Sequence, residues 1–503
     1  MIFKELFLLF LFCLWPFVNF VAHNVGQGVP LGRVTAYAVG FLFLTLLWVG
    51  MVKFALRQYP LKRLICFTAL AIVIFVNFSN ISWVFAEVGL PHYRYAFFSS
   101  GILLLLAWRL SKIPNIRKAI VTAGIVMVGI PLIQIGFFSL NGGSATLYAS
   151  VLSSKPKGNF TTSTQRKPNI YFIILDMYTR GDVLQEVFGY DNSTFLEALR
   201  QRDFYIADKS YSNYPFTGAS VSSTLQMDYL LKESDQELNI DISIIRGKNK
   251  TVQTLKNFGY NYVHFDNGLW LGAACSGYED VCLLNAKGAG IPELEYSLLQ
   301  PTLFLPLYKK FVVSKKEGSS GLPELTQSLA IKKHREPVFL YAHIIAPHPP
   351  YIYHQDCSQT HTLDWDLASR KQEDKEAYRD NLVCVSKQVL SLIDQIIAGD
   401  PEAMILVQGD HGTFFQGQAL IPPPLWGEPQ LHEGYGILNA FHLPQNCGKH
   451  LYPSISPVNS FRLVKACLTD NEPELLPDKR IKTAHMGRLG SGNWYFLKKE
   501  DEN

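Results

Sequence analysis

Four long stretches without a charged residue dominate the first 140 residues of this 503-residue chain. A helix that crosses a hydrocarbon core of roughly 30 Å needs about 20 apolar residues, because each residue adds about 1.5 Å. A fifth stretch, Tyr95–Trp108, is shorter and spans a membrane only if Arg94 and Arg109 extend to the interfaces. We therefore expect residues 1–140 to form a transmembrane anchor of about five helices, with the four long spans at Leu6–Ala22, Val34–Val52, Leu64–Ala86 and Ala119–Leu140.

The basic residues around these spans fix the expected orientation. They favour one side by nine to two, and cytoplasmic loops are the ones enriched in Lys and Arg. With the N-terminus inside and an odd number of spans, everything after Leu140 lies outside. The alternative for the first stretch is a cleaved signal peptide, but the stretch is long and no small-residue cleavage site follows it. The nine are Lys4, Lys53, Arg57, Lys62, Arg63, Arg109, Lys112, Arg117 and Lys118, and the two are Arg33 and Arg94.

The net charge of +4 conceals two different halves. Residues 1–150 contain 11 Lys and Arg against 2 Asp and Glu, whereas the remainder contains 35 against 40. No half combines strong basicity with a soluble composition, so a nucleic-acid partner is disfavoured. No span contains an internal carboxylate or lysine, so a transport pathway has little support.

Six of the eight cysteines fall in the half that is expected to lie outside. An even number in an oxidising compartment favours disulfides. The close pair Cys275 and Cys282 is the first candidate, and Cys357–Cys384 and Cys447–Cys467 are pairings by proximity among 15 possible connectivities. A cysteine-rich zinc site is the alternative, but the chain has no C-x-x-C pair.

The outer half has the pattern of one α/β domain. Residues 141–167, rich in Gly, Ser, Thr and Lys, are expected to be a linker, and residues 168–503 the domain. Short apolar runs alternate with amphipathic stretches, which indicates a mostly parallel sheet covered on both faces. The predicted strands are Ile170–Leu175, Asp203–Ala207, Tyr260–Phe265, Val338–Ile345 and Ala403–Val407, and the predicted helices are Ser193–Arg202, Thr251–Phe258 and Lys375–Ala398.

Polar side chains follow three of these strands, where ligands gather in such sheets. Asp176 follows the first strand, Asp410-His411-Gly412 follows the last, and Val338–Ile345 leads through His343 to His348. A single Asp after a strand usually caps the next helix. An Asp-His-Gly after one central strand together with an Asp after another is much less often a coincidence. Carboxylates and an imidazole suit zinc or manganese. The sequence therefore predicts a divalent-metal site.

A hydroxyl-rich segment, residues 213–224, has the pattern of a tight helix start after Pro215. A hydroxyl there meets unpaired backbone N–H groups that favour an alkoxide and a bound phosphate. An ordinary Ser/Thr cap is an equally good interpretation. The residues alone do not select the nucleophile among Thr217, Ser220, Ser222, Ser223 and Thr224.

Together these motifs resemble the sulfatase-like branch of the alkaline phosphatase superfamily over about residues 166–480. The matching segments, in order, are Ile170–Asp176, Asn213–Ser223, Phe339–Tyr351 (FLYAHIIAPHPPY) and Ile405–Gly412 (ILVQGDHG). With preceding spans, the chain is similar to membrane-anchored phosphoethanolamine transferases and lipoteichoic acid synthases, although the membrane part matches only in layout.

The resemblance implies one metal ion, Zn or Mn, held by Asp176, Thr217, Asp410 and His411, with Thr217 as the nucleophile. It implies phosphate-side roles for His348 and, more loosely, His343. A strand near Gly436–Leu443, preceded by His432, would complete the site. We also expect substrate contacts from Asn213 and Arg180, although a solvated arginine explains Arg180 equally well.

Two departures from that family matter. The C/S-x-P/A-x-R motif that sulfatases convert to formylglycine is absent, which disfavours sulfate-ester hydrolysis. Two-metal members carry a further Asp shortly before the histidine that matches His348, whereas this chain has Ile344, Ile345 and Ala346, so a second metal is doubtful.

The expected function is the transfer of phosphoethanolamine or phosphoglycerol from a membrane phospholipid to an envelope glycan or lipid. The expected location is the bacterial inner membrane, multi-pass, with a periplasmic C-terminal domain. Two alternatives stay open: a sulfatase-like or phosphodiester hydrolase, and a non-catalytic lipid-binding or regulatory envelope protein.

Overall fold

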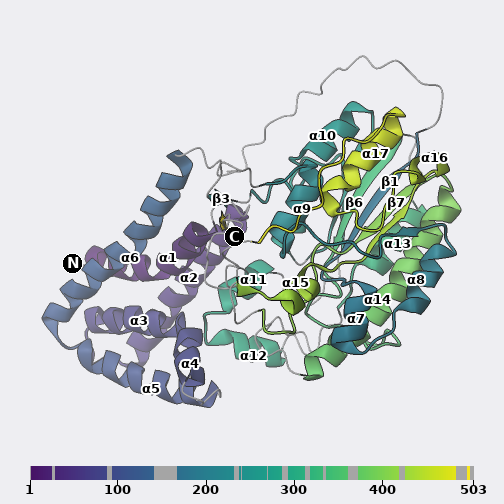
Figure 1. Cartoon of the computed structure of the whole chain (residues 1–503). Helices are drawn as coiled ribbons and strands as arrows, with labels where there is room; N and C mark the ends of the chain where they lie inside the picture. The colour runs from purple at the N-terminus through teal and green to yellow at the C-terminus, as the bar shows by residue number, and fades with distance from the viewer. Residues whose placement is uncertain are drawn as a thin grey trace. The chain divides into compact units, whose positions relative to one another are not determined.

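The computed structural model describes residues 2–24, 29–87, 93–140, 167–230, 237–239, 241–268, 270–285, 293–311, 318–331, 336–360, 372–418, 425–482 and 496–498. The described residues fall into two compact units (Figure 1). The membrane unit contains residues 2–140 together with 293–311, and the outer unit contains the others. The predicted linker at 141–167 lies outside the described residues except for Lys167.

The N-terminal part of the membrane unit is entirely helical. Its helices are α1 (Ile2–His23), α2 (Leu31–Ala55), α3 (Leu61–Phe75), α4 (Phe78–Glu87), α5 (Tyr93–Leu110) and α6 (Pro114–Leu140). Helices α1, α2 and α6 are each long and apolar enough to cross a membrane, and α3 with α4 passes as one span bent by 52°. The expectation of membrane-spanning helices at the N-terminus is confirmed.

Helix α5, the short fourth span of the prediction, has 18 residues but does not reach the apolar composition of the others. Arg94 and Arg109 lie at its two ends, where they would reach the interfaces of a bilayer. Counting α5 as a span gives the odd number that leaves the outer unit outside.

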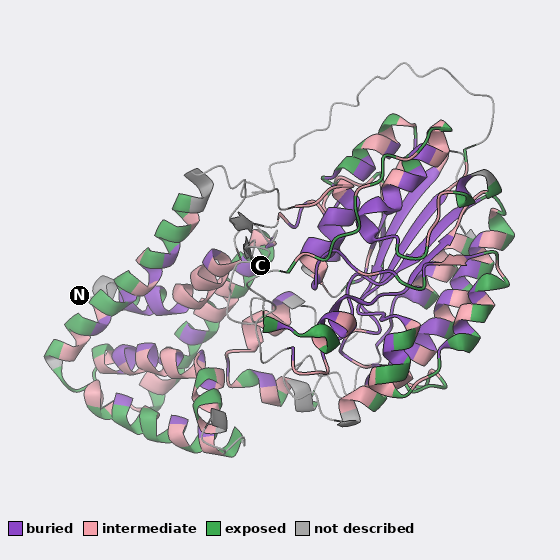
Figure 2. Ribbon diagram, in the orientation of Figure 1, coloured by how far each residue is buried: buried purple, intermediate pink, exposed green. Residues whose placement is uncertain are grey.

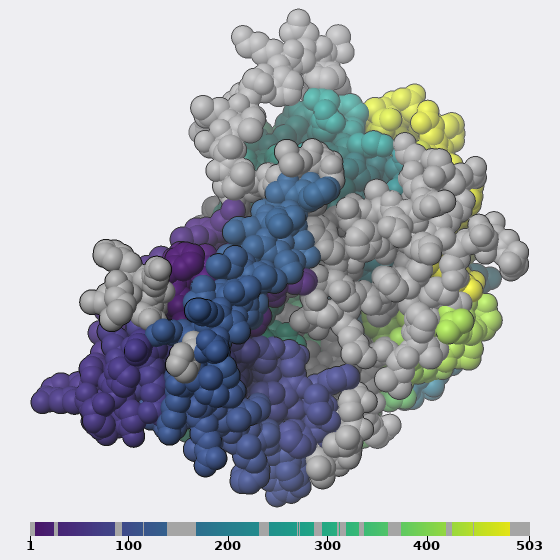
Figure 3. Space-filling model, turned by 90° about the vertical axis from the view of Figure 1, so that its left-hand side faces the viewer, coloured from purple at the N-terminus to yellow at the C-terminus, as the bar shows by residue number. Residues whose placement is uncertain are grey.

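Many large apolar side chains of the membrane unit are exposed, and exposed residues recur along its helices in Figure 2. Phe43, Phe54, Phe98, Ile133 and Phe137 are each at least 60% exposed, which would be unfavourable in water and is normal against lipid. The same N-terminal helices form the purple and blue surface in Figure 3. One further helix, α14 (Gln372–Gly399), also passes the length and hydropathy criteria, but it packs into the core of the outer unit through Leu382 and Val385.

A seven-stranded sheet in the order β2-β8-β7-β1-β6-β4-β5 forms the centre of the outer unit. Its strands are β1 (Ile170–Leu175), β2 (Tyr205–Ile206), β4 (Asn261–Asp266), β5 (Val281–Leu284), β6 (Val338–Ile344), β7 (Met404–Gln408) and β8 (Asn439–His442); β3 (Glu237–Asn239) pairs separately with β9 (Phe496–Lys498). Strand β1 is parallel to both β6 and β7, and β8 is antiparallel to β2 and β7. The predicted, mostly parallel sheet is confirmed.

Helices cover both faces of this sheet (Figure 1). Tyr171, Ile173 and Leu175 of β1 point into one core cluster, whereas Ile170 and Phe172 point into the other. A strand buried on both faces reads as a continuous apolar run, which is why IYFIIL lacks alternation. The helices on the first face are α7 (Gly181–Phe188), α8 (Ser193–Arg200), α13 (Leu322–Ile331) and α14; those on the second are α9 (Thr217–Gln226), α10 (Lys250–Asn257) and α17 (Ser460–Thr469).

Four further short helices are not among those assigned to the two faces of the sheet. They are α11 (Glu293–Leu299), α12 (Phe304–Phe311), α15 (Glu428–Tyr435) and α16 (Gln445–Gly448), with 3-10 turns at Leu271–Ala273 and Pro457–Asn459. The predicted strand Asp203–Ala207 shrinks to two residues because Asp203 has a φ of 59° and closes a turn after α8. The predicted strand near Gly436–Leu443 is β8.

The three predicted disulfides are confirmed: Cys275–Cys282, Cys357–Cys384 and Cys447–Cys467. All three lie in the outer unit, and disulfides persist in oxidising compartments. They therefore fit an outer unit that lies outside the cytoplasm. Cys13 and Cys66, in the membrane unit, are free and buried.

Candidate metal centre

The centre forms where β1, β6 and β7 end side by side. Asp176 directly follows β1, and its backbone N–H donates to Ile344 O at 2.9 Å. Asp410 lies two residues after β7, and its Oδ1 accepts from the N–H of Met177 at 3.0 Å. Because the strands are parallel, their carboxyl ends meet at one edge of the sheet.

Asp176, Asp410 and His411 bring one ligand atom each within 4.8 Å of one another. His411 Nε2 lies 3.7 Å from Asp176 Oδ1 and 3.6 Å from Asp410 Oδ2. The Nδ1–H of His411 donates to Gly412 O at 2.8 Å, so Nε2 carries the lone pair that a metal would use. Asp176 Oδ1 and Asp410 Oδ2 are buried and have no hydrogen-bond partner among the described residues. Unpartnered carboxylate oxygens converging with an imidazole nitrogen fit a divalent cation.

The pKa values of the two carboxyl groups also favour a bound cation at this cluster. Burial and the Asp410 carboxylate raise the pKa of Asp176 from 3.8 to about 7, although His348 and His411 act in the opposite direction. Burial works to raise the pKa of Asp410 as well, but His411 and His343 outweigh it and leave that pKa below its usual value. Without a cation, the Asp176 carboxyl thus keeps its proton up to about pH 7 beside the Asp410 carboxylate, and a bound cation would replace that proton.

This raised pKa predicts how the metal-free protein responds to pH. Between about pH 4 and pH 7 the folded state holds a proton on Asp176 that the unfolded chain has lost, so folding stability falls as pH rises through this window and levels off above it. Added Zn²⁺ or Mn²⁺ should therefore raise Tm more at pH 8 than at pH 5. Differential scanning calorimetry of the protein after chelation measures both effects.

The matched control is Asp394→Asn, which removes an exposed carboxylate that pairs with Arg202 at 2.6 Å. It should keep the wild-type pH response, whereas Asp176→Asn should lose it. An equal response to metal at both pH values would contradict the assignment.

Thr217 is the first residue of α9 and faces the same cluster. Its Oγ1 lies 3.3 Å from His411 Nε2. Three of the other four hydroxyls bond locally: Ser220 donates to Asp410 O at 2.6 Å, Ser223 to Asp228 O and Thr224 to Ser220 O. The fourth, Ser222, is buried and has no hydrogen-bond partner among the described residues.

His343 and His348 both contact Asp176. His343, on β6 and fully buried, has its Nε2 3.2 Å from Asp176 Oδ2, and burial lowers its pKa to about 4. A neutral His343 therefore donates to Asp176. The N–H of His348 donates to Asp176 O at 3.1 Å, its Nδ1–H donates to Pro349 O, and burial lowers its pKa. Both histidines adjoin the predicted site.

The other three predicted substrate residues have contacts away from the metal cluster. Asn213 is buried, donating to Ser456 Oγ at 3.0 Å and accepting from Val458 N–H at 2.9 Å. The guanidinium of Arg180 donates twice to Asp182 at 2.7 Å and lies over the Tyr211 ring.

His432 Nε2 lies 3.3 Å from Glu186 Oε2, and its Nδ1 lies 3.5 Å from Arg180 Nη2. His432 and Arg180 therefore share one polar cluster, and their substrate roles stay predictions.

Two positioning residues escaped the sequence reasoning. The fully buried Glu433 accepts from Thr413 Oγ1 at 2.7 Å, Phe415 N–H at 2.6 Å, Gln416 N–H and Gln418 Nε2, so it holds the loop after His411. Phe414 of this loop stacks on the His411 ring at 5.3 Å. A Cβ on Gly412 would lie 1.8 Å from Glu433 O, which explains the glycine after His411.

Tyr378, on α14, holds the loop after β1. Its hydroxyl donates to Met177 O at 2.8 Å and accepts from the N–H of Thr179. It lies one helical turn before Leu382, so the helical periodicity could have placed it on the buried face. No comparable signal marks Glu433, because glutamate usually lies at the surface.

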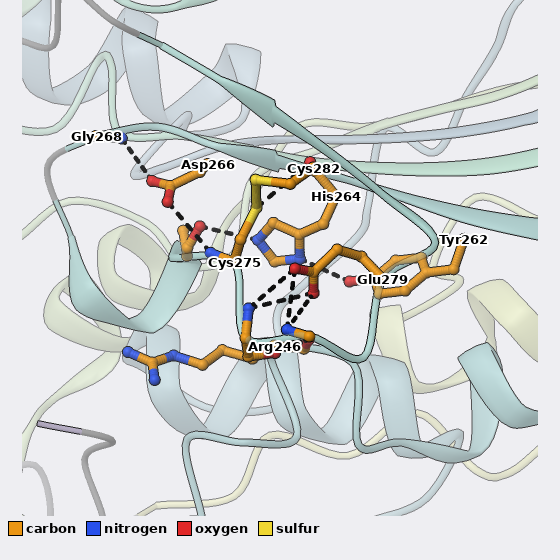
Figure 4. The surroundings of a disulfide bond; sticks show 11 residues. Arg246, Tyr262, His264, Asp266, Gly268, Cys275, Glu279 and Cys282 are labelled. Carbon is orange, nitrogen blue, oxygen red and sulfur yellow. Dashed lines mark hydrogen bonds between the residues drawn. A yellow bond between two sulfur atoms is a disulfide. The ribbon is translucent and has the colours of Figure 1, made fainter. Parts of the chain in front are cut away.

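A second cluster with metal-binding residue types, Cys275, Glu279 and Cys282, surrounds the first disulfide (Figure 4). Both sulfurs are consumed in the disulfide, and Glu279 accepts from the N–H groups of Ser276 and Gly277. The buried His264 beside it contacts Tyr262 OH at 2.7 Å and Ala273 O at 2.8 Å. This cluster is structural.

Comparison with known proteins identifies the family of this chain. The family model described as Sulfatase matches residues 168–435, more than half of the chain, and the chain belongs to this family. No curated protein sequence matches significantly.

Three solved structures illustrate the similarity. Lipooligosaccharide phosphoethanolamine transferase A from Neisseria meningitidis is 14% identical, with a TM-score of 0.43, over 91% of this chain and 95% of its own. The C-terminal periplasmic domain of phosphoethanolamine transferase EptC from Campylobacter jejuni is 12% identical, with a TM-score of 0.39, over 60% and 89%. Phosphonate monoester hydrolase of Agrobacterium radiobacter is 13% identical, with a TM-score of 0.41, over 65% and 82%. Family membership rests on the Sulfatase match.

Proposed function

We propose that this protein is a membrane-anchored, metal-dependent transferase that moves a phospho-alcohol group, phosphoethanolamine or phosphoglycerol, from a phospholipid to an envelope glycan or lipid. The observation that carries the proposal is the position of Thr217. Its hydroxyl opens α9 and lies 3.3 Å from His411 Nε2, beside two buried carboxylate oxygens without partners.

Asp176, Asp410, His411 and Thr217 would hold one divalent ion, Zn or Mn. The bound ion supplies positive charge that lowers the pKa of the Thr217 hydroxyl and neutralises charge on the phosphoryl oxygens. His343 positions Asp176 by donating its Nε2–H to the carboxylate at 3.2 Å. It does not act as a general acid, because its lowered pKa keeps the imidazole neutral.

The reaction proceeds in two displacements. Thr217 Oγ bonds to the phosphorus of the donor lipid and passes its proton to His348, which its lowered pKa keeps neutral and whose Nε2 carries the lone pair because Nδ1–H donates to Pro349 O. The bond from phosphorus to the diacylglycerol oxygen breaks, and that oxygen takes the proton from His348. A hydroxyl of the acceptor then attacks the same phosphorus and gives its proton to His348, the bond to the Thr217 oxygen breaks, and His348 returns the proton to Thr217.

Sulfate-ester hydrolysis is the weaker alternative. The segment has Thr217 where sulfatases carry the Cys or Ser that becomes formylglycine, and Val221 where their motif has Arg. The membrane helices also favour a lipid substrate, because a bilayer donor requires an enzyme held at the bilayer.

The test uses the full-length protein in proteoliposomes that contain phosphatidylethanolamine or phosphatidylglycerol with radiolabelled headgroups. Diacylglycerol should appear only with metal, and mass spectrometry should find the headgroup phosphate on the peptide that contains Thr217. Hydrolysis of an aryl sulfate with no diacylglycerol would favour a sulfatase instead.

The binding-protein alternative gives a different result. A non-catalytic envelope protein would bind lipid without releasing diacylglycerol, and would show no stoichiometric metal. The proposal fails if the purified protein has neither metal nor turnover with either phospholipid.

A further inference from the structure

Residues 293–311 belong to the membrane unit although they lie in sequence within the outer half. The chain leaves the outer unit after β5, forms α11 and α12, and returns to it by α13. Residues 293–311 contribute no strand to the central sheet. Their contacts are with the membrane helices.

Residues 301 and 303 supply backbone hydrogen bonds at the break between α3 and α4. In a continuous helix the N–H of Ser79 would donate to Phe75 O, four residues earlier. The bend between α3 and α4 breaks this bond. Ser79 N–H donates instead to Pro301 O at 3.2 Å, and Phe75 O accepts instead from Leu303 N–H at 3.3 Å. The inserted segment thus satisfies both the donor and the acceptor of this broken hydrogen bond.

The same contact has side-chain support. The Ser79 hydroxyl donates to Gln300 O, and the Phe75 and Phe304 rings meet edge to face at 4.8 Å. At the start of α2, Arg33 and Tyr37 both bond the Glu295 carboxylate of α11. The insertion is therefore held at two separate membrane helices.

The depth of the break gives this contact its significance. Phe75 lies 12 residues after Arg63, at the end of α3 that the charge pattern predicts to be cytoplasmic. That is about 18 Å of helix within a hydrocarbon core of roughly 30 Å. Unpaired backbone groups are costly at such a depth, so a bend there requires partners from protein.

Helix α12 presents an apolar face beside this contact. Phe304, Leu307 and Phe311 follow the spacing i, i+3 and i+7, which places them on one side, and they are 52%, 41% and 60% exposed. Leu305, from the other side, is buried.

We propose that residues 293–311 form a membrane-embedded hairpin. Residues 300–303 close the break between α3 and α4, and the Phe304–Leu307–Phe311 face of α12 lies in the lipid of the outer leaflet. The occupant of this face is lipid because the segment is bonded to spanning helices above the middle of the bilayer, where protein surfaces meet acyl chains. The inference does not depend on the proposed transferase activity.

The test places a benzophenone photoprobe at single positions of the full-length protein in nanodiscs. A probe at Leu307 should form phospholipid adducts as efficiently as one at Phe137, which is 65% exposed on α6. The matched negative control is Leu284, an apolar residue of the outer unit that is 67% exposed. The proposal is wrong if Leu307 labels lipid no better than Leu284, or if its adducts join two copies of the chain.

A charge swap tests the docking separately. Arg33→Glu and Glu295→Arg should each lower Tm in nanodiscs, and the double variant should recover most of the loss because the ion pair is restored. A double variant no more stable than the single variants would overturn the docking.

Discussion

Thr217→Ala should lower turnover of the lipid donor by at least about 10³-fold, because the remaining groups cannot replace a missing nucleophile. The metal should still bind when it is supplied in excess, since Asp176, Asp410 and His411 are unchanged. Diacylglycerol release and metal content, measured on the same proteoliposome sample, separate these two effects. The covalent headgroup adduct should disappear from the peptide.

Two variants make this result specific. Ser222→Ala removes another hydroxyl of α9, one that is buried and has no hydrogen-bond partner among the described residues, and should keep wild-type turnover. Thr217→Ser keeps a hydroxyl at the same position and should recover part of the activity. If Thr217→Ala turns over like the wild type, another residue is the nucleophile.

Asp410→Asn should weaken metal affinity by at least about 100-fold and abolish turnover at limiting metal, because it removes one charge of the cluster. An amide oxygen can still accept from Met177 N–H and His411 N–H, as Asp410 Oδ1 does at 3.0 and 2.9 Å. The fold should therefore survive. Isothermal titration with Zn²⁺ and elemental analysis after dialysis measure the loss.

The stability of the metal-free variant distinguishes a ligand from a structural carboxylate. Without metal, Asp410→Asn should be at least as stable as the wild type above pH 7, because it removes the repulsion that adds to burial in raising the pKa of Asp176. A purely structural Asp410 would instead leave Asp410→Asn less stable with and without metal, and this outcome would reject the metal assignment.

Much of the outer unit is encoded locally in the sequence. The run Ile170–Leu175 has no polar residue, which only a strand covered on both faces tolerates, and Asp176 and Asp410 end up adjacent because parallel strands finish at the same edge. The convergence of Asp176, Asp410 and His411 was therefore predictable from where the apolar runs stop. From the residues alone Thr217 was predictable only as one of five hydroxyls, since helix periodicity does not reveal which one faces His411, and it was the family resemblance that selected it.

Features that depend on distant partners were not predictable. Glu433 is buried because four hydrogen-bond donors from residues 413–418 converge on its carboxylate. No local sequence pattern predicts that these donors meet there. The insertion at 293–311 contains two short amphipathic helices that resemble any surface helices, whereas the backbone groups they satisfy lie more than 220 residues away. The positive φ of Asp203, which shortens a predicted strand, is likewise set by the turn after α8.

The Cys357–Cys384 disulfide has a consequence for the order in which this protein matures. Cys357 lies in the segment that follows β6 and carries His348, and Cys384 is in the middle of α14. The bond therefore ties the His348 segment to the same helix that supplies Tyr378 to the loop after β1. Since thiols stay reduced in the cytoplasm, this covalent link forms only after the outer unit has been exported. Maturation is thereby coupled to secretion: a chain retained in the cytoplasm lacks the crosslink that completes the surroundings of its metal centre.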